Sequence, residues 1–404
     1  MARVLLAMSG GVDSSVAAKL LLDQGHEVVG VFMRLGSPGE SLDELTPAEA
    51  ALACDTSKIR IGKQGCCSVG DSADARAVAA ELGITLYVAN FKKDFTRIID
   101  YFVAEYARGR TPNPCVRCND WLKFGRLHDQ AQQLGCDFVA SGHYARVVRI
   151  DAGEHQLRRA VDAHKDQTYV LFGVPRAKLA HMLLPVGGFT KPEIRELAER
   201  SGLPVFDKPD SQEICFVPDQ DYAGLVERRS PETARTGDVL DTEGNKVGEH
   251  AGQHRFTIGQ RRGVGVALGY PIYVVQKNPD ANTITVGPRE ALMSRSLVAA
   301  EANWLDATDA HAAEPGPWRA CLAAHRYNHP PQPGRVRTLP AASVPSELAP
   351  SGRTGRFEVE FDDPQDAVTP GQAVCLYDAA DPGRVLGGGW IAQAKEPEGK
   401  SSEG

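Results

Sequence analysis

The sequence predicts an α/β fold: a doubly wound parallel sheet, followed by a small β-rich central domain and a C-terminal β-barrel. Up to about residue 142, short apolar runs alternate with helical patterns, which is typical of parallel strands joined by helices. After Cys215, short strands with turn signals take over. The 404 residues, 42% of them hydrophobic, suffice for two or three domains that each bury a core.

The α/β part is expected to hold buried strands at 4–8, 26–33, 84–90 and 136–142. The helices between them are expected at 13–24, 71–82, 91–108 and 120–134. Gly25, Gly83 and Gly135 follow three of these helices, as C-terminal caps do. Residues 36–65 fit no period and are expected to form an insertion, to which the sequence assigns no role.

The remainder begins with a helical pattern over 165–203, in which Lys191-Pro192-Glu193 opens a helix that ends at Gly202. The β-rich segments follow at 237–250, 271–276, 281–286, 319–327, 355–361 and 372–377, with a loop at 340–353. The predicted domains are 1–218 (α/β), 219–295 (small and β-rich) and 296–394 (all-β, a barrel or a sandwich), with a disordered tail at 395–404.

Composition excludes several classes of protein. No apolar run approaches the roughly 20 residues that span a bilayer, and no signal region precedes Ser9, so we expect a cytoplasmic protein without a membrane partner. Nine cysteines, an odd number, argue against a disulfide framework. The net charge of −7 means that any nucleic acid would have to bind at local basic patches.

A glycine-rich loop follows the first strand and opens the first helix: Ser9-Gly10-Gly11-Val12-Asp13-Ser14. Free backbone amides, hydroxyls and a helix N-terminus together favour phosphate. The loop is neither a Walker loop nor a Rossmann fingerprint. The alternative is a glycine turn that binds nothing.

Two cysteines stand in Asn113-Pro114-Cys115-Val116-Arg117-Cys118-Asn119, which we expect to be a loop whose following helix is capped by Asp120. Arg117 and Lys123 are close in sequence, so a lowered pKa of the Cys118 thiol is expected. The alternative is half of a zinc site completed by Cys66-Cys67. We expect no other metal site, and we expect the isolated cysteines to act as small buried hydrophobes, Cys54, Cys136, Cys321 and Cys375.

These motifs together resemble those of the bacterial tRNA-specific 2-thiouridylases, which belong to the PP-loop (N-type ATP pyrophosphatase) superfamily. The resemblance rests on the phosphate loop, Asn-Pro-Cys-x-x-Cys-Asn, Ser-Gln-Glu-Ile-Cys-Phe at 211–216, and further matches in family order over nearly the whole chain, at 109–114, 142–146, 165–167, 256–260 and 369–372. It implies an adenine nucleotide alpha hydrolase-like fold and a tRNA-uridine 2-sulfurtransferase. Such an enzyme uses ATP and Mg²⁺ to adenylate O2 of the flipped wobble uracil in the anticodon arm. Sulfur from a cysteine persulfide, supplied by a donor protein, then replaces that oxygen, releasing AMP and pyrophosphate.

The resemblance also implies site residues. Cys118 corresponds to the nucleophile and Cys215 to the persulfide carrier, with which Cys118 forms a transient disulfide. The residues implied to bind ATP are Ala7, Met8, Ser9, Gly10, Gly11, Val12, Asp13, Ser14, Met33 and Gly142. Those implied to contact tRNA are Asn113, Pro114, Cys115, His143, Lys165, Asp166, Gln167, Arg326, Tyr327 and Gln372.

Charge pattern gives separate support for RNA binding. The stretch 319–337 holds four arginines and Tyr327 without an acidic residue, and Arg255, Arg261 and Arg262 form a second basic stretch. The alternative for each is an ordinary solvated face. His143, taken alone, would more often be a structural histidine.

The chain departs from the family pattern at Cys115, where many relatives carry Asp. Either Cys115 only shapes the base pocket, or Cys115, Cys118 and Cys215 hold a 4Fe-4S cluster. Two other functions compete with thiolation: an ammonia-dependent amidating or lysidine-type PP-loop enzyme, which needs no thiols, and a non-catalytic RNA-binding redox or zinc module.

Overall fold

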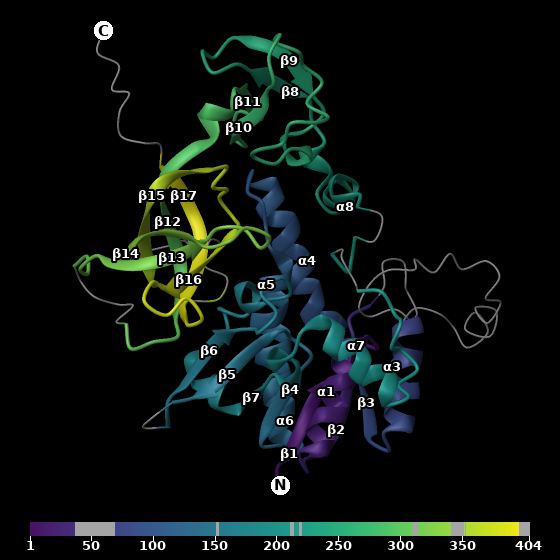
Figure 1. Ribbon diagram of the computed structural model, residues 1–404. Coiled ribbons are helices and arrows are strands. Elements are labelled where there is room, and N and C mark those ends of the chain that lie inside the picture. Colours follow the sequence, from purple (N-terminus) through teal and green to yellow (C-terminus); the bar gives the residue numbers. More distant parts are fainter. Residues whose placement is uncertain are drawn as a thin grey trace, which may run out of the picture. The chain divides into compact units, whose positions relative to one another are not determined.

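The structure is a computed structural model that describes residues 1–36, 69–150, 153–210, 214–217, 220–308, 314–340, 351 and 353–395 (Figure 1). Most of the predicted insertion, most of the loop 340–353 and residues 396–404 lie outside the described residues. The chain forms two compact units. The first contains Met1–Arg97, Arg126–Tyr144 and His181–Asp221, and the second contains Ile98–Gly125, Ala145–Ala180 and Tyr222–Gly404.

The first unit is built on a five-stranded parallel sheet in the order β3-β2-β1-β4-β7. Its strands are β1 (Arg3–Ala7), β2 (Glu27–Arg34), β3 (Thr85–Asn90), β4 (Phe138–Ser141) and β7 (Met182–Leu183). Val4, Leu5 and Leu6 are fully buried, because helices cover a parallel sheet on both faces. The strand order reverses direction at β1, and the carboxyl edge there is where doubly wound folds bind ligands. The predicted doubly wound fold is confirmed.

Helices α1 (Val12–Asp23), α3 (Val69–Glu81), α6 (Leu127–Gln133) and α7 (Lys191–Arg200) complete this unit, and α4 (Lys92–Ala107) begins in it. In α7, Thr190 and Glu193 form a capping box, which lowers the pKa of the Glu193 carboxyl through hydrogen bonds from Thr190. This helix packs beside α1 (Figure 1). Its N-terminal residue Lys191 therefore lies near the start of α1.

The second unit contains the predicted barrel, which is closed by six strands in the order β12-β15-β14-β13-β16-β17. Its strands are β12 (Met293–Trp304), β13 (Arg319–Ala324), β14 (Gln332–Leu339), β15 (Arg356–Asp366), β16 (Ala373–Asp378) and β17 (Val385–Lys395). Val336, Phe357 and Ile391 fill its fully buried core. Strands β12, β14 and β17 were not predicted, and Lys395 belongs to β17 rather than to the predicted tail.

The same unit holds the predicted β-rich central sheet, of order β10-β11-β8-β9. Its strands are β8 (Gly237–Leu240), β9 (Lys246–His250), β10 (Tyr273–Asn278) and β11 (Thr283–Gly287), preceded by α8 (Tyr222–Arg229). A hairpin of β5 (Ala145–Arg149) and β6 (His155–Arg159) was not predicted.

One helix prediction is wrong, and a second helix begins earlier than predicted. The span 165–190 contains no α-helix but the short 3₁₀ turns η3 (Thr168–Val170), η4 (Arg176–His181) and η5 (Pro185–Gly188), because Pro175 and Pro185 interrupt the backbone hydrogen bonds. The helix expected at 120–134 begins earlier, as α5 (Pro114–Arg117), and continues through the π-helix η1 (Cys118–Arg126) into α6.

Candidate active site

The phosphate loop connects β1 directly to α1. Gly10 has φ +73°, a backbone conformation that glycine adopts without strain. The hydroxyl of Ser14 accepts from the Ser9 amide at 3.2 Å and donates to the Gly11 carbonyl at 3.1 Å. These bonds hold the loop in shape, so that the N-terminal amides of α1 can receive an anion.

Gly142 lies against this loop. A Cβ at position 142 would stand 2.6 Å from the Ser14 nitrogen and 2.7 Å from the Asp13 carbonyl carbon. Met33 is buried near the end of β2. Because β2 and β4 flank β1, the predicted residues Met33 and Gly142 lie on either side of the loop. The structure thus brings the predicted ATP-binding residues together at one edge of the sheet.

Two lysines that the sequence analysis missed also hold this loop. The Lys191 ammonium lies 2.7 Å from the Asp13 carboxylate and 2.7 Å from that of Asp210. The hydroxyl of Tyr144 donates to the same Asp13 oxygen at 2.8 Å. Lys191 opens the predicted helix in the sequence Lys-Pro-Glu, but its partners are distant in sequence, so no local pattern marks it.

Lys208 binds the other side of the loop. Its ammonium donates to the Gly10 carbonyl at 3.0 Å and to the carboxylates of Asp71 at 2.7 Å and Asp74 at 2.5 Å. Burial lowers the pKa of Lys208, but the two carboxylates outweigh it and raise the pKa above its ordinary value. Lys208 therefore stays cationic beside the loop, in a setting that suits phosphates.

Cys215 belongs to the first unit, in the short described stretch 214–217. Its thiol is partly exposed and forms no disulfide in this structure. The next residue, Phe216, packs edge-to-face on Phe95 at 5.6 Å between ring centroids, and Val217 is buried. The apolar pair thus anchors the segment on one side of the cysteine.

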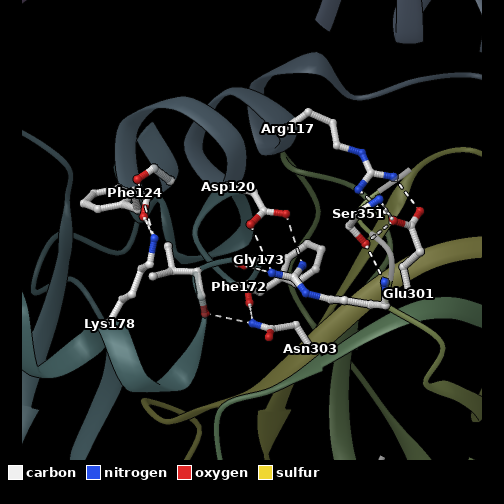
Figure 2. A network of polar contacts seen from close by, with 12 residues as sticks. Arg117, Asp120, Phe124, Phe172, Gly173, Lys178, Glu301, Asn303 and Ser351 are labelled. Carbon is white, nitrogen blue, oxygen red and sulfur yellow. Dashed lines mark hydrogen bonds and ion pairs between the residues drawn. The ribbon is translucent and has the colours of Figure 1, made fainter. Parts of the chain in front are cut away.

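The segment that carries Cys118 is helical, so the expectation of a loop is wrong. The Asn113 side chain caps α5 by accepting from the Val116 amide at 3.3 Å. Cys118 begins the π-helix, a distortion frequent at functional sites. Asp120 is no cap either: it lies inside η1 and pairs with Arg353 at 3.0 Å (Figure 2).

Arg117, whose charge is one reason to expect a lowered pKa of the Cys118 thiol, is paired with a carboxylate in the structure. The Arg117 guanidinium is buried and forms an ion pair with Glu301 (Figure 2). Because this carboxylate compensates the charge, Arg117 is not a free cation beside the thiol. Of the cysteines predicted to be buried hydrophobes, Cys136, Cys321 and Cys375 are buried, and Cys54 lies outside the described residues. Burial raises the pKa of Cys321 and of Cys375 to about 12.

Several predicted tRNA contacts gather in the second unit around Tyr327, whose side chain is 45% exposed. Burial raises the pKa of its phenol, as do the charges of Asp166 and Cys115, while Lys165 and a hydrogen bond with Gln167 oppose them. The Tyr327 ring also packs against Tyr169 at 5.8 Å. An aromatic ring beside a lysine and an amide can stack and bind a nucleotide.

Other residues that are predicted to contact tRNA form hydrogen bonds within the protein. Asp166 is largely buried and accepts from the Ala160 amide at 2.9 Å and the Thr168 hydroxyl at 2.6 Å. The Gln372 side chain donates to the Thr111 carbonyl at 3.2 Å. In the first unit, His143 is buried and bonded to the Ser141 hydroxyl at 2.7 Å.

The arginine stretch 319–337 is less basic than its sequence indicates. Three of its arginines pair with acids from elsewhere in the barrel unit, as Arg319–Asp306, Arg335–Glu360 and Arg337–Glu358. Arg326 donates to the Ala367 carbonyl at 3.0 Å. In the second stretch, Arg255 pairs with Glu227, whereas Arg261 and Arg262 are exposed.

In the described part of the chain, no three His, Cys, Asp or Glu side chains are grouped to hold a metal ion. None of the described helices is long and apolar enough to cross a membrane. Cys66 and Cys67, the expected second half of a zinc site, lie outside the described residues.

The chain matches known proteins along almost its whole length. Residues 2–219 match the family described as tRNA methyl transferase HUP domain, 225–288 its PRC-barrel domain, and 294–391 an aminomethyltransferase beta-barrel domain. The tRNA-specific 2-thiouridylase MnmA of Rhodopirellula baltica is 48% identical over 98% of this chain and 97% of that protein. The one of Chloroflexus aurantiacus is 44% identical over 97% of this chain and 99% of its own.

Among solved structures, a 4-thiouridine synthetase–RNA complex with bound ATP aligns with 57% of this chain and 51% of that chain. Its TM-score of 0.34 and identity of 16% are too low to bear on function. The full-length identities of 44% and 48%, by contrast, show that the chain belongs to the tRNA-specific 2-thiouridylase family.

Proposed function

We propose that this chain catalyses ATP-dependent 2-thiolation of the wobble uridine of tRNA, with Cys118 as nucleophile and Cys215 as persulfide carrier. The observation that carries the proposal is the combination of a PP-loop with two at least partly accessible thiols on a chain of this family. An amidating PP-loop enzyme needs the loop but not the thiols, and a non-catalytic module needs no loop.

The phosphate loop would bind ATP through the N-terminal amides of α1. Met33 and Gly142 would border the adenosine, and Lys191 and Lys208 would offset the negative charge of the phosphates. Mg²⁺ would compensate more of that charge during adenylyl transfer, with Asp13 as the carboxylate of this loop that could bind it. Adenylation converts O2 of uracil, a poor leaving group, into a phosphate ester oxygen that can leave.

Sulfur transfer would then use both cysteines. A donor protein charges Cys215 as a persulfide, and the Cys118 thiolate attacks the Sγ of Cys215. The Cys118–Cys215 bond forms, the persulfide S–S bond breaks, and the terminal sulfur leaves with the electron pair as the sulfide that displaces AMP from C2. A dithiol reductant must afterwards restore the two thiols. One thiol stores the sulfur and the other releases it.

The tRNA anticodon arm would present the unstacked wobble base at low energetic cost. We assign contacts with the target base to Asn113, Pro114 and Cys115, and with its surroundings to His143. The remaining RNA contacts would come from Lys165 to Gln167, Arg326, Tyr327 and Gln372. We propose that domain 1–218 supplies the ATP chemistry, that barrel 296–394 contributes RNA contacts, and that the enzyme works in the cytoplasm, where ATP and tRNA are available.

Cys115 has two candidate roles, and one experiment can distinguish them. It lies three residues before Cys118, so the two side chains share one helix face, and Cys115 is exposed. This position suits a residue that lines the base pocket, and equally a thiolate ligand of a 4Fe-4S cluster completed by Cys118 and Cys215. Protein purified without oxygen decides between them: full thiolation activity without iron or visible absorption would eliminate the cluster.

The proposal is tested by incubating the protein with ATP, Mg²⁺, a persulfide donor and unmodified tRNA, then digesting the tRNA and measuring 2-thiouridine by mass. Cys118→Ser and Cys215→Ser should abolish 2-thiouridine but still form pyrophosphate. The buried Cys136→Ala is the matched control and should retain both activities. Good tRNA binding without 2-thiouridine in the wild type would overturn the proposal. Formation of 2-thiouridine at the wild-type rate by Cys118→Ser would exclude Cys118 as the nucleophile.

A further inference from the structure

Arg117 stands between Cys115 and Cys118, yet its side chain is only 1% exposed. Both terminal nitrogens donate to Glu301 of β12, at 3.0 Å and 2.5 Å (Figure 2). The guanidinium also lies 3.8 Å from the ring centroid of Trp390 in β17. A side chain next to the proposed nucleophile is therefore fixed in the barrel unit from two strands.

Glu301 is held in an unusual backbone conformation for this pairing. Its φ is +51°, and the register between β12 and β17 shifts between Ala300 and Asn303. Such a bulge re-aims a side chain, and a strained non-glycine residue persists only where its surroundings hold it. Ser351 donates a further hydrogen bond to the Glu301 carboxylate from its amide, at 3.0 Å. The barrel is thus specifically shaped to present this carboxylate to Arg117.

Further contacts tie the residues around Cys118 to the barrel. The Thr111 amide donates to the Pro370 carbonyl at 3.0 Å, and Gln372 donates back to the Thr111 carbonyl. On the other side of Cys118, Asp120 accepts two bonds from Arg353, at 3.1 Å and 3.0 Å (Figure 2). Hydrogen bonds and ion pairs therefore hold this segment in place at Thr111 before the two cysteines, at Arg117 between them and at Asp120 after them.

The geometry of the helix relates the Arg117–Glu301 ion pair to the orientation of the Cys118 thiol. Residues three apart, such as Cys115 and Cys118, share a face, whereas adjacent residues point about 100° apart. Arg117 is buried while Cys115 is exposed and Cys118 is partly exposed. Fixing Arg117 against Glu301 consequently fixes the rotation of the helix and the direction in which both thiols point.

We propose that Arg117, through its ion pair with Glu301, is a positioning residue that aims Cys118 for attack on the persulfide, so that the barrel controls the sulfur-transfer step. This inference rests on the proposed role of Cys118. It assigns no part of the adenylation step to the pair, because the phosphate loop is built from residues of the other unit.

The test separates the two half-reactions. Glu301→Gln keeps the shape of the side chain and removes its charge. The matched control is Asp381→Asn, which makes the same change in a bidentate pair, Arg158–Asp381, elsewhere in this unit. For each variant, tRNA-dependent pyrophosphate formation and single-turnover 2-thiouridine formation from persulfide-loaded enzyme are measured. A second variant, Arg117→Met with Glu301→Leu, removes both charges together, a change that buried pairs often tolerate without loss of stability.

We expect Glu301→Gln and the double variant to slow thiolation at least about tenfold, since misplacement of a reacting group by about 1 Å can cost 100-fold. Pyrophosphate formation should stay within about twofold, and inorganic sulfide should restore thiolation because it bypasses the attack by Cys118. Asp381→Asn should leave both steps unchanged. Thiolation at the wild-type rate in either variant, or an equal loss of both half-reactions, would overturn the inference. Wild-type thiolation by Cys118→Ser would instead overturn the proposed function, and the inference with it.

Discussion

Replacing Gly142 by alanine should disable adenylation without unfolding the protein. The new Cβ would stand 2.6 Å from the Ser14 nitrogen, 2.7 Å from the Asp13 carbonyl carbon and 2.9 Å from the Ser14 Cα. Ordinary contact begins at 3.4 Å, so the start of α1 and the end of β4 must separate by about 0.8 Å, which is 3.4 minus 2.6. All three atoms are backbone, which a side-chain rotation cannot move away.

A displacement of this size at a site that positions phosphates should lower kcat/KM for pyrophosphate formation about 100-fold, or about 2.7 kcal/mol. The assay is tRNA-dependent pyrophosphate release at subsaturating ATP, with thermal unfolding to verify the fold. Gly188→Ala is the control, because nothing lies within 4 Å of a Cβ at that position. If Gly142→Ala stays within about threefold of the wild type, the described contact between β4 and the phosphate loop does not position ATP.

Three further predictions concern Lys191, Tyr327 and Lys277. Lys191→Met removes the cation shared by Asp13 and Asp210 and should weaken ATP binding about tenfold in calorimetry. The control Lys19→Met breaks an exposed pair with Asp23 and should leave ATP binding unchanged. Equal ATP affinities of the Lys191→Met and Lys19→Met variants would contradict this prediction. Tyr327→Ala should weaken tRNA binding about tenfold in a filter assay, through loss of a stacking ring, and leave ATP binding unchanged; undiminished tRNA affinity would refute the role. Burial lowers the pKa of Lys277 from 10.5 to about 7, so the unfolded chain binds more protons between these values and stability rises with pH across them. Lys277→Met should remove that rise in the unfolding midpoint, and an unchanged pH dependence in the variant would show that Lys277 is not its source.

The parts of the fold that local pattern determines could be predicted from the sequence. Strands β1, β2 and β4 are apolar runs that are largely buried, and the phosphate loop lies where such a strand meets a helix. The strand expected at 84–90 forms as β3, but the expectation that it is buried is wrong, because Tyr87 and Val88 are exposed. The central strands were found because turns separate them. By contrast, β12, which carries Glu301, and β17, which carries Trp390, were missed, and Pro114 was assigned to a loop although it opens α5.

The contacts that organise the site could not be predicted, because their partners are far apart in the chain. Arg117 and Glu301 are separated by 184 residues, and Lys191 and Asp13 by 178. Proximity in sequence suggested that Arg117 acts on Cys118, but the buried guanidinium points to the barrel. In the sequence, Arg335 and Arg337 form a basic run, but in the barrel strand β15 places Glu360 and Glu358 opposite them. Sequence motifs are the basis for proposing Cys118 and Cys215 as the reacting residues, whereas tertiary pairing determines which charges remain available.

The central claim is that Cys118 and Cys215 together deliver one sulfur atom to tRNA. The most direct measurement is a single turnover with persulfide-loaded enzyme, ATP and tRNA in the absence of reductant, followed by proteolysis and mass analysis of the peptides. We predict one Cys118–Cys215 disulfide for each 2-thiouridine formed, and neither product when ATP is omitted. Formation of 2-thiouridine with both cysteines still unlinked would contradict the two-thiol account.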